Sequence, residues 1–249
     1  MSTQCSAWPY PRWIAHRGAG KLAPENTLAA FQRGASHGYR MFECDVKLSA
    51  DGVPFLLHDS TLERTTNGHG TAGQQPWAAL AVLDAGSWHS STFAGERLPS
   101  LAQIAAACLA NHWLLNIEIK PTPGSETLTG TVVANAAAAL WANAVVPPLL
   151  SSFQPLALQA AQDAQPHLPR GLLLDTLPAD WLHTAQGLAC SAVICQHRLW
   201  TKATVAQARS AGLKTLSYTV NDMASVQRLL ALGTDGLITD RMDEFQPNP

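Results

Sequence analysis

The sequence predicts an α/β fold, a TIM (β/α)8 barrel with a small inserted subdomain after the second strand. Two observations favour it. Short β-rich runs alternate with longer Ala-, Leu- and Gln-rich stretches of helical spacing, which is typical of βα units around a parallel sheet. The length of 249 residues is common for an α/β barrel with one core, so residues 1–249 are predicted to form a single domain.

Nine runs have the composition and length of strands, one more than an eightfold barrel can hold. Only residues 47–52 separate the second run from the third, which is too short for a crossover between parallel strands. Asp51-Gly52 favours a hairpin turn, so the third run is predicted to lie antiparallel to the second, outside the barrel. The predicted strands cover residues 12–15, 41–46, 53–57, 113–119, 149–153, 171–174, 192–195, 215–220 and 236–239.

Stretches with apolar faces predict helices at residues 27–38, 100–110, 130–143, 156–164, 201–211 and 223–232. Asn26 is expected to cap the first of them, and Gly38, Gly212 and Gly233 stand where glycines commonly end helices. Residues 60–99 are polar, rich in glycine and serine and weakly periodic, unlike the βα units around them. We expect them to cap the barrel mouth, as part of an insertion at about 47–99.

Charge and cysteine content narrow the classes of partner. A formal net charge of -2 without a long Lys/Arg run argues against nucleic acid or an anionic membrane as the main partner. Five scattered cysteines without CxxC spacing favour reduced thiols and a cytoplasmic location. The chain shows neither a signal peptide nor a stretch that suits a membrane span, so no membrane insertion is expected. We expect a small-molecule substrate, and the sequence is compatible with a homodimer.

Charged side chains stand at the ends of four predicted strands, within otherwise apolar runs. In a parallel α/β barrel the carboxyl ends of the strands converge on one face, and polar residues there are candidates for function. Glu43 and Asp45 are two residues apart, so on a strand their side chains point to the same face. Glu118 and Lys120 repeat this arrangement. The full candidate set is His16, Arg17, Glu43, Asp45, His58, Glu118 and Lys120.

Three carboxylates that point into one barrel mouth, Glu43, Asp45 and Glu118, need a cation, because buried unpaired carboxylates are costly. Oxygen ligands with no cysteine or histidine at ligand spacing favour a hard divalent ion, Mg²⁺ or Ca²⁺, over zinc. Each charged pair alone has a structural interpretation, as a solvated face or an ion pair. The combination of four charged strand ends is what favours a functional site.

Two histidines are expected within reach of a phosphate at this mouth. His16 and His58 suit general acid and base catalysis, since an imidazole titrates near neutrality, although each alone has a structural interpretation. Arg17 and Lys120 are expected to neutralise the phosphate charge, which grows in the transition state.

Other side chains are weaker candidates. Asp235 and Asp240 flank Gly-Leu-Ile-Thr and are expected to cap or brace the last strand. Candidates for contact with an alcohol group, or for the lining of the mouth, are Trp77, Trp88, Trp200 and His197.

These residues fall in segments that resemble the glycerophosphodiester phosphodiesterase family, of the bacterial cytosolic type, and the resemblance runs over nearly the whole chain. In order, the segments are HRGAGKLAPENT (16–27), ECDVKLSADG (43–52), LLHD (56–59), NIEIKP (116–121), SF (152–153), YTVN (218–221) and DGLITD (235–240). Tyr218 stands where the family usually has a tryptophan, a departure that is expected to alter contact with the alcohol group.

The resemblance implies a barrel with a small insertion, in agreement with the fold predicted from periodicity, and it implies roles. The two histidines match the family's acid/base pair, the three carboxylates match its metal ligands, and Arg17 and Lys120 match its phosphate contacts. Glu25, within the Pro-Glu-Asn-Thr segment, is expected to orient these groups.

The implied reaction is metal-dependent hydrolysis of a glycerophosphodiester, such as glycerophosphocholine or glycerophosphoethanolamine, to sn-glycerol 3-phosphate and a free alcohol. The attacking group is either the 2-hydroxyl of glycerol, through a cyclic phosphate, or water. A lysophospholipase D-like enzyme acting on lipids is an alternative, disfavoured because the sequence lacks an anchor or a basic amphipathic segment. A binding module without turnover is another, disfavoured because both histidines and all three carboxylates are present.

Overall fold

The computed structural model describes residues 8–247, in which strands and helices alternate over most of the chain. The strands are β1 Trp13–Ala15, β2 Met41–Leu48, β3 Pro54–Leu56, β4 Leu114–Ile119, β5 Leu149–Ser152, β6 Arg170–Leu174, β7 Ala192–Gln196, β8 Lys214–Tyr218 and β9 Gly236–Thr239. The α-helices are α1 Leu28–Ser36, α2 Trp77–Leu80, α3 Leu101–Asn111, α4 Glu126–Leu140, α5 Pro155–Ala164, α6 Trp181–Gly187, α7 Lys202–Ser210 and α8 Met223–Leu232. Short 3₁₀ helices are η1 Ala72–Gln74, η2 Ser91–Phe93 and η3 His197–Leu199.

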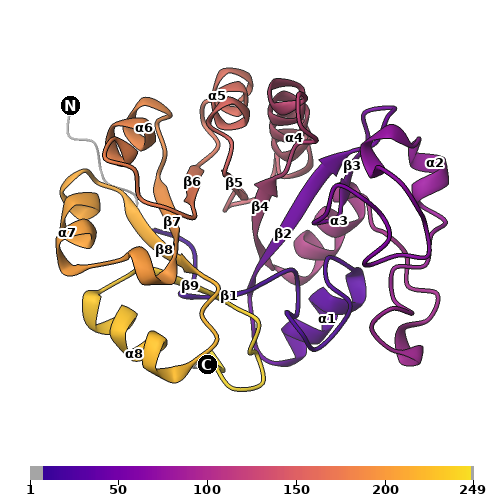
Figure 1. Ribbon diagram of the computed structural model, residues 1–249, viewed down its shortest axis with the longest axis horizontal. Helices are drawn as coiled ribbons and strands as arrows, with labels where there is room; N and C mark the ends of the chain where they lie inside the picture. Colours follow the sequence, from indigo (N-terminus) through magenta and orange to yellow (C-terminus); the bar gives the residue numbers. More distant parts are fainter. Residues whose placement is uncertain (1–7, 248–249) are drawn as a thin grey trace.

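All strands of residues 8–247 except β3 run parallel and close into a barrel, which confirms the predicted TIM fold. β1 closes it, because Ala15 pairs with Phe42 of β2 while Ile14 pairs with Ile238 of β9. The helices lie around the outside of the strands (Figure 1). Since β1 and β9 are neighbours, residues from opposite ends of the sequence meet at the same face of the barrel.

β3 is the surplus strand. It pairs antiparallel with β2, with Val46 opposite Leu56 and Leu48 opposite Pro54, as the short connection predicts. Gly52 has a φ of +79° in this turn, a conformation that side chains with a Cβ rarely adopt. The hairpin carries β2 two residues past its predicted end and returns the chain to the barrel mouth, where His58 lines a cavity.

Side chains of the strands alternate between a core inside the barrel and a core beneath the helices. On β2, Met41 belongs to the inner cluster, and Cys44 belongs to the outer one. All eight residues of β2 are buried, and the alternation turns Glu43 and Asp45 inward, with Met41. Carboxylates on the inner face contribute nothing to apolar packing, so their presence there indicates a function at the mouth.

Helix α1 has a different cap from the predicted one. The Thr27 hydroxyl oxygen accepts a hydrogen bond from the backbone N–H of Ala30 at 3.2 Å, so Thr27 is the N-cap. The prediction for Asn26 is wrong because Asn26 adopts a φ of 59° and its side chain bonds to Asp45 instead. Helix α6 was not predicted from the sequence, because its seven residues are too few to establish a helical period.

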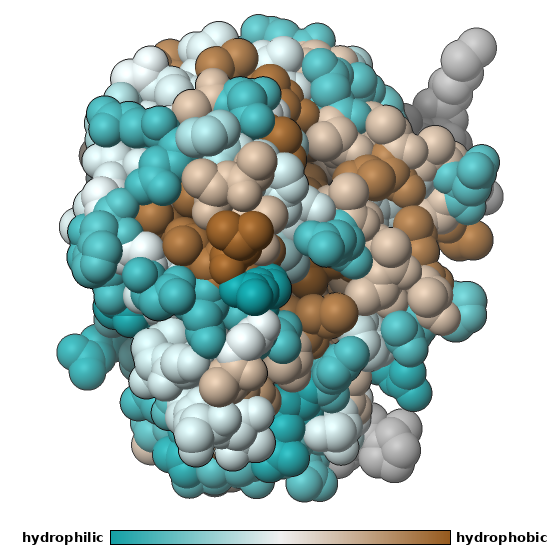
Figure 2. All heavy atoms as spheres, turned by 90° about the vertical axis from the view of Figure 1, so that its right-hand side faces the viewer, coloured by the Kyte–Doolittle hydropathy of each residue, from teal (hydrophilic) through white to brown (hydrophobic). Residues whose placement is uncertain are grey.

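Residues 57–100, which we call the lobe, connect β3 to α3. The lobe contains η1, α2 and η2 and has a small core of its own, in which Leu62 and Leu80 are fully buried against Phe55 of β3. It lies beyond β3 at the right of Figure 1. Figure 2 shows the molecule from that side, with hydrophobic groups interspersed among hydrophilic ones.

Two expectations from composition bear on the described residues. Their four cysteines are buried and unpaired, as expected of reduced thiols, and Cys5 lies outside residues 8–247. Within the same range no helix combines the length and apolarity that crossing a bilayer requires.

Candidate active site

Three carboxylates meet at the carboxyl ends of β2 and β4. Asp45 of β2 pairs with Glu118 of β4, and Glu43 lies two residues earlier on β2. One oxygen of each carboxylate lies within 4.8 Å of the others, and the residues are only 1–8% exposed. The structure therefore brings together the residues that the sequence predicts as metal ligands.

The acidic cluster of Glu43, Asp45 and Glu118 is electrostatically unbalanced. Burial raises the pKa of Glu43, and the charge of Asp45 raises it further. Burial raises the pKa of Glu118 in the same way, again with a contribution from Asp45. Burial also acts to raise the pKa of Asp45, but Lys120 and Arg17 outweigh it, so the net shift is downward. Two of the three carboxylates thus carry their charge at a cost.

A divalent cation fits the acidic cluster. The nearby cations are Lys120, whose Nζ lies 3.3 Å from Asp45 and 3.0 Å from Glu118, and Arg17, whose Nε lies 3.4 Å from Asp45. Two cations leave one of the three negative charges uncompensated, and buried charges require compensation. Because the converging donors are all oxygens, a hard divalent ion suits them.

The loop after β1 orients the cluster from one side. The backbone N–H of Arg17, which has a φ of 50°, donates to Glu43 at 3.0 Å, and its guanidinium donates to Glu25 at 2.9 Å. Asn26 donates to the Asp45 carboxylate at 2.8 Å and accepts a hydrogen bond from the Asp45 N–H at 3.1 Å. The Pro-Glu-Asn-Thr segment therefore holds both Arg17 and Asp45 of the cluster in place.

His16 follows β1 and is held by the residue that follows β9. Its Nδ1 lies 2.6 Å from Oδ1 of Asp240, and the amide of Asn221 donates to the other Asp240 oxygen at 2.8 Å. Its Nε2 lies 3.9 Å from Glu43. Burial lowers the pKa of His16, but the hydrogen bond to Asp240 and the charge of Glu43 outweigh it, so the net shift is upward.

His58 follows the hairpin and has a similar support. Its Nδ1 lies 2.6 Å from Asp59, which accepts hydrogen bonds from Arg64 at 2.6 and 2.9 Å. Burial lowers the pKa of His58, and together with the cations Arg17 and Lys120 it outweighs the opposing effects of Asp45 and of the hydrogen bond to Asp59, so the net shift is downward. The pKa values of the two histidines thus shift in opposite directions, because their charged surroundings differ.

A cavity of about 180 Å³ joins these groups, which we call the mouth cavity. It is lined by all the predicted site residues except Asp45, which lies behind them, and by Asn116, Phe153, Leu173, Tyr218, Thr219 and Ile238. A neighbouring cavity of about 270 Å³, the side cavity, shares His58, Glu118, Lys120 and Phe153 with it and extends past Lys47 and Ser60 to Gln154. His58 therefore borders both spaces.

The structure gives different outcomes for the weaker candidate residues. Trp200 is 1% exposed, and its indole N–H donates to the carbonyl of Leu216, so the prediction that it contacts an alcohol group is wrong. Trp77, Trp88 and His197 do not line either cavity. Asp235 does brace the last strand as predicted, because it accepts hydrogen bonds from the backbone and hydroxyl of Thr215 and from Lys214.

Asp240 is the main correction at the site. It was expected to brace the last strand, yet its carboxylate contacts His16. The signal was present in the sequence, because Asp240 follows the last strand as His16 follows the first, and in a closed barrel these strands are neighbours. Asn26 and Asp59 were likewise not assigned the contacts that they make with Asp45 and His58.

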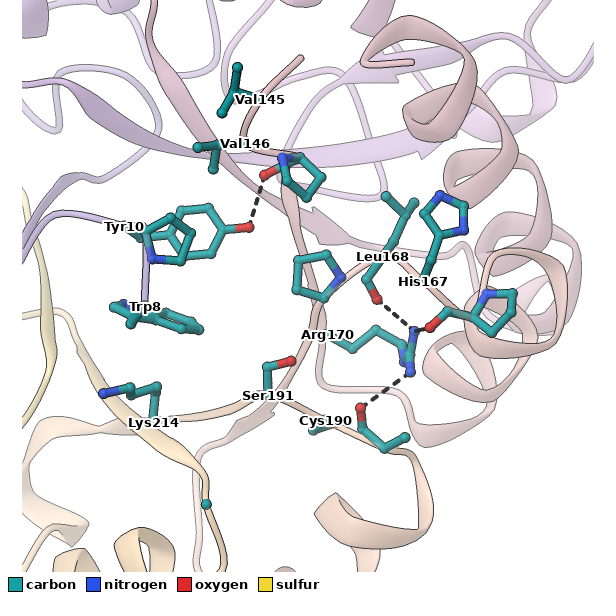
Figure 3. A pocket seen from close by; sticks show the side chains of 16 residues that line it. Trp8, Tyr10, Val145, Val146, His167, Leu168, Arg170, Cys190, Ser191 and Lys214 are labelled. Carbon is teal, nitrogen blue, oxygen red and sulfur yellow. Dashed lines mark hydrogen bonds between the residues drawn. The ribbon is translucent and has the colours of Figure 1, made fainter. Parts of the chain in front are cut away.

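A larger cavity of about 700 Å³ opens at the opposite, amino-terminal end of the strands, and we call it the basal cavity (Figure 3). Arg170 at its wall is 3% exposed and donates to the carbonyls of Leu168 at 2.7 Å and Leu188 at 3.1 Å. Among the described residues that line it there is no carboxylate. It offers neither a metal site nor an acid/base pair.

The fold and the mouth cavity define the class of protein: a (β/α)8-barrel enzyme with an acidic cluster, two histidines and two cations at the carboxyl ends of its strands. Comparison with known proteins gives the family. A profile of the glycerophosphoryl diester phosphodiesterase family matches residues 16–244. The chain therefore belongs to this family and is a phosphodiesterase.

Relatives and solved structures agree with this assignment. A glycerophosphodiester phosphodiesterase of Caldanaerobacter subterraneus subsp. tengcongensis is 33% identical over 231 residues, covering 91% of this chain and 93% of the relative. The structure of an Oleispira antarctica phosphodiesterase in complex with the product sn-glycerol 3-phosphate matches with a TM-score of 0.87 and 32% identity, over 94% of both chains. A glycerophosphodiester phosphodiesterase of Agrobacterium tumefaciens matches with a TM-score of 0.78 and 28% identity, over 94% of this chain and 98% of that one.

Proposed function

We propose that this phosphodiesterase hydrolyses glycerophosphodiesters, such as glycerophosphocholine and glycerophosphoethanolamine, to sn-glycerol 3-phosphate and a free alcohol, with Mg²⁺ or Ca²⁺ as the metal. The observation that carries the proposal is the buried cluster of Glu43, Asp45 and Glu118, within 4.8 Å of one another and flanked by two histidines. The product in the Oleispira antarctica structure supports the same substrate class.

Glu43, Asp45 and Glu118 would hold the divalent ion. The chemistry that such an ion supplies when bound is polarisation of a phosphate oxygen. Arg17 and Lys120 line the same cavity and would neutralise the phosphate charge that grows in the transition state. Both cations are held in place by carboxylates, Arg17 by Glu25 and Lys120 by Glu118, so little reorganisation is needed when substrate binds.

His16 is proposed as the general base. With its Nδ1–H donating to Asp240, Nε2 is the atom free to accept a proton from the attacking hydroxyl, and the resulting imidazolium is stabilised by the same carboxylate. The attacking hydroxyl is either the 2-hydroxyl of glycerol or water. In both cases a P–O bond forms to it as its proton passes to His16. If the 2-hydroxyl attacks, the product is a cyclic phosphate, and water then adds to phosphorus as the P–O bond to C2 breaks, which gives sn-glycerol 3-phosphate.

His58 is proposed as the general acid. It lies between the mouth cavity and the side cavity, so the departing alcohol oxygen lies next to it if the two halves of the substrate occupy the two spaces. Its Nδ1 is held by Asp59, which leaves Nε2 to give a proton to the alcohol oxygen as the P–O bond to it breaks. We propose that the lobe belongs to the barrel domain and forms the wall of the side cavity at Ser60.

The test is release of sn-glycerol 3-phosphate from glycerophosphocholine by metal-stripped protein, with Mg²⁺ or Ca²⁺ restored. We expect turnover that depends on the metal and is lost in His16→Ala and Glu43→Ala. His167→Ala is a matched control, because His167 lines the basal cavity, and it should retain full turnover. Well-folded protein that releases no product with either metal would overturn the proposal.

A further inference from the structure

Asn116 on β4 has a buried side chain without a partner. The residue is 1% exposed, and neither Oδ1 nor Nδ2 of its carboxamide makes a hydrogen bond within the protein. Buried polar groups in folded proteins are almost always paired, and an unpaired carboxamide is costly because it can make several hydrogen bonds. The residue is therefore better explained by a ligand than by the stability of the fold.

The position of Asn116 points to the mouth cavity. It lies two residues before Glu118 on the same strand, so its side chain also faces inward, about 6–7 Å deeper in the barrel. It lines the mouth cavity together with Leu173 and Ile238, which belong to the apolar cluster inside the barrel. Asn116 is thus a polar group on a floor that is otherwise apolar.

The arrangement of the two cavities decides which part of the substrate reaches this floor. Under the proposed function, the phosphate would lie at the cluster, beside Arg17 and Lys120, and the departing alcohol would lie beyond His58 in the side cavity. The glycerol half would then extend from the phosphate toward the floor. Its carbons would contact Leu173 and Ile238, and its terminal hydroxyl would meet the carboxamide.

We propose that Asn116 is a specificity-determining residue whose carboxamide hydrogen-bonds the C1 hydroxyl of the glycerol moiety, the hydroxyl farthest from the phosphate. The inference rests on the proposed function, since it assumes a glycerophosphodiester in the mouth cavity. A carboxamide offers both a donor and an acceptor, which matches a hydroxyl. A buried site built to bond a hydroxyl rejects the analogue that lacks it, because the site's own polar group is then left unpaired.

The test compares two substrates that differ in one atom. One is sn-glycero-3-phosphocholine, and the other is its analogue with hydrogen in place of the C1 hydroxyl, which keeps the 2-hydroxyl needed for cyclisation. We expect the protein to prefer the first by about 10- to 100-fold in kcat/KM. In Asn116→Leu, whose side chain has the same branched shape, the preference should fall to within about threefold, with most of the loss on the natural substrate.

Two measurements on the free protein separate specificity from structure. Asn116→Leu should keep or raise the melting temperature, since it removes an unpaired buried amide, and should leave the calorimetric affinity for Mg²⁺ unchanged. Asn116→Ala controls for steric effects of the leucine side chain and should show the same loss of substrate preference. Ser217→Ala is the matched control, because the Ser217 hydroxyl is also buried and unpaired but does not line either mouth-side cavity.

Binding of product makes the test independent of turnover. Calorimetry should show that sn-glycerol 3-phosphate binds more tightly than its 1-deoxy counterpart, and that Asn116→Leu removes the difference. An unchanged preference in the variant would overturn the proposal. Equal losses of kcat/KM on both substrates, together with weaker Mg²⁺ binding, would also overturn the proposal. That result would mean that Asn116 bonds to water around the metal and not to the substrate. Failure to turn over any glycerophosphodiester would count against the proposed function, whereas the product-binding comparison would still decide the role of Asn116.

Discussion

Arg17 and Arg170 stand at opposite ends of the same barrel, and their guanidinium groups have opposite surroundings. Arg17 follows β1 at the carboxyl end, faces the carboxylates of Asp45 and Glu25, and has a buried Nε without a hydrogen-bond partner. Arg170 begins β6 at the amino end, and backbone carbonyls accept hydrogen bonds from all three of its nitrogens. One arginine retains unused hydrogen-bonding capacity, and the other uses its capacity to hold loops together.

The same difference separates the two cavities. The basal cavity is the larger, yet Tyr10, Arg170 and Lys214 in its lining bond to the protein itself. The mouth cavity is smaller, but it contains like charges in contact, two histidines with opposite pKa shifts and an unpaired carboxamide. The candidate site is therefore marked by polar groups without partners and not by cavity volume. Its position agrees with the general division of an α/β barrel into a functional carboxyl end and a stabilising amino end.

The largest effect should come from the acidic cluster. Glu43→Gln keeps an acceptor for the Arg17 N–H but removes one of the three charges, so kcat/KM should fall on the order of 1,000-fold. In the presence of chelator the variant should melt no lower than the parent protein, because like-charge repulsion is relieved. The upward shift in melting temperature that added Mg²⁺ gives the parent should disappear. Asp163→Asn, an exposed carboxylate change on α5, should alter neither property.

At the basal end the expected effect is on stability instead. Arg170→Met leaves several buried carbonyls without their donor, so the free energy of unfolding should fall by about 2–4 kcal/mol in urea denaturation. Turnover per folded molecule at 25 °C should stay within about twofold of the parent value. A folded variant with strongly reduced kcat would contradict the division of roles between the two ends.

The two ends can also be compared on a single strand, since Asp235 and Asp240 flank β9. Asp240→Asn weakens the support of His16 and should lower kcat by about 10- to 100-fold with little change in KM. Asp235→Asn breaks contacts with Lys214 and Thr215 and should lower the melting temperature with kcat unchanged. Equal effects of the two substitutions on kcat would show that Asp240 acts only through the strand.

The smallest effect should come from the support of His58, which is partly exposed. Hydrogen bonds from Arg64 lower the pKa of Asp59, and this effect is larger than the opposing effect of burial. The hydrogen bond with His58 lowers the pKa of Asp59 as well. A carboxylate whose pKa is lower in the folded than in the unfolded protein stabilises the folded state. This contribution is complete above the unfolded-state pKa of about 3.9 and is lost as the pH falls through the folded-state pKa. Arg64→Ala should therefore move acid unfolding, followed by circular dichroism, to higher pH, while the loss at pH 7 stays below about 1 kcal/mol. An unchanged acid midpoint would mean that the Arg64 pairs are screened by solvent.

Periodicity was sufficient to predict the barrel. The alternation of β-rich and helical stretches predicted every strand, and the short connection at residues 47–52 predicted that β3 would lie outside. Boundaries were less predictable, because they depend on tertiary contacts: β2 is longer than predicted because the hairpin pairs its last residues with β3. The cap at Thr27 was missed because the fold uses Asn26 to bond Asp45.

At the site, the residues that sequence could find were charged groups on strands, where a two-residue period fixes their direction. The supports of these groups were harder to find. Asp240 contacts a residue 224 positions earlier in the chain, and only the closure of the barrel brings them together. Asn116 has no charge to mark it, and its lack of a partner is a property of the folded structure alone.

The central claim is that a divalent cation binds at Glu43, Asp45 and Glu118. Mn²⁺ can replace Mg²⁺ at oxygen sites, and it scatters anomalously, so a crystal soaked in Mn²⁺ locates the ion without reference to activity. We predict one strong anomalous peak bound by these three carboxylates, absent from Glu43→Gln crystals soaked in the same way. A peak elsewhere on the protein, or none at the cluster at saturating Mn²⁺, would contradict the account.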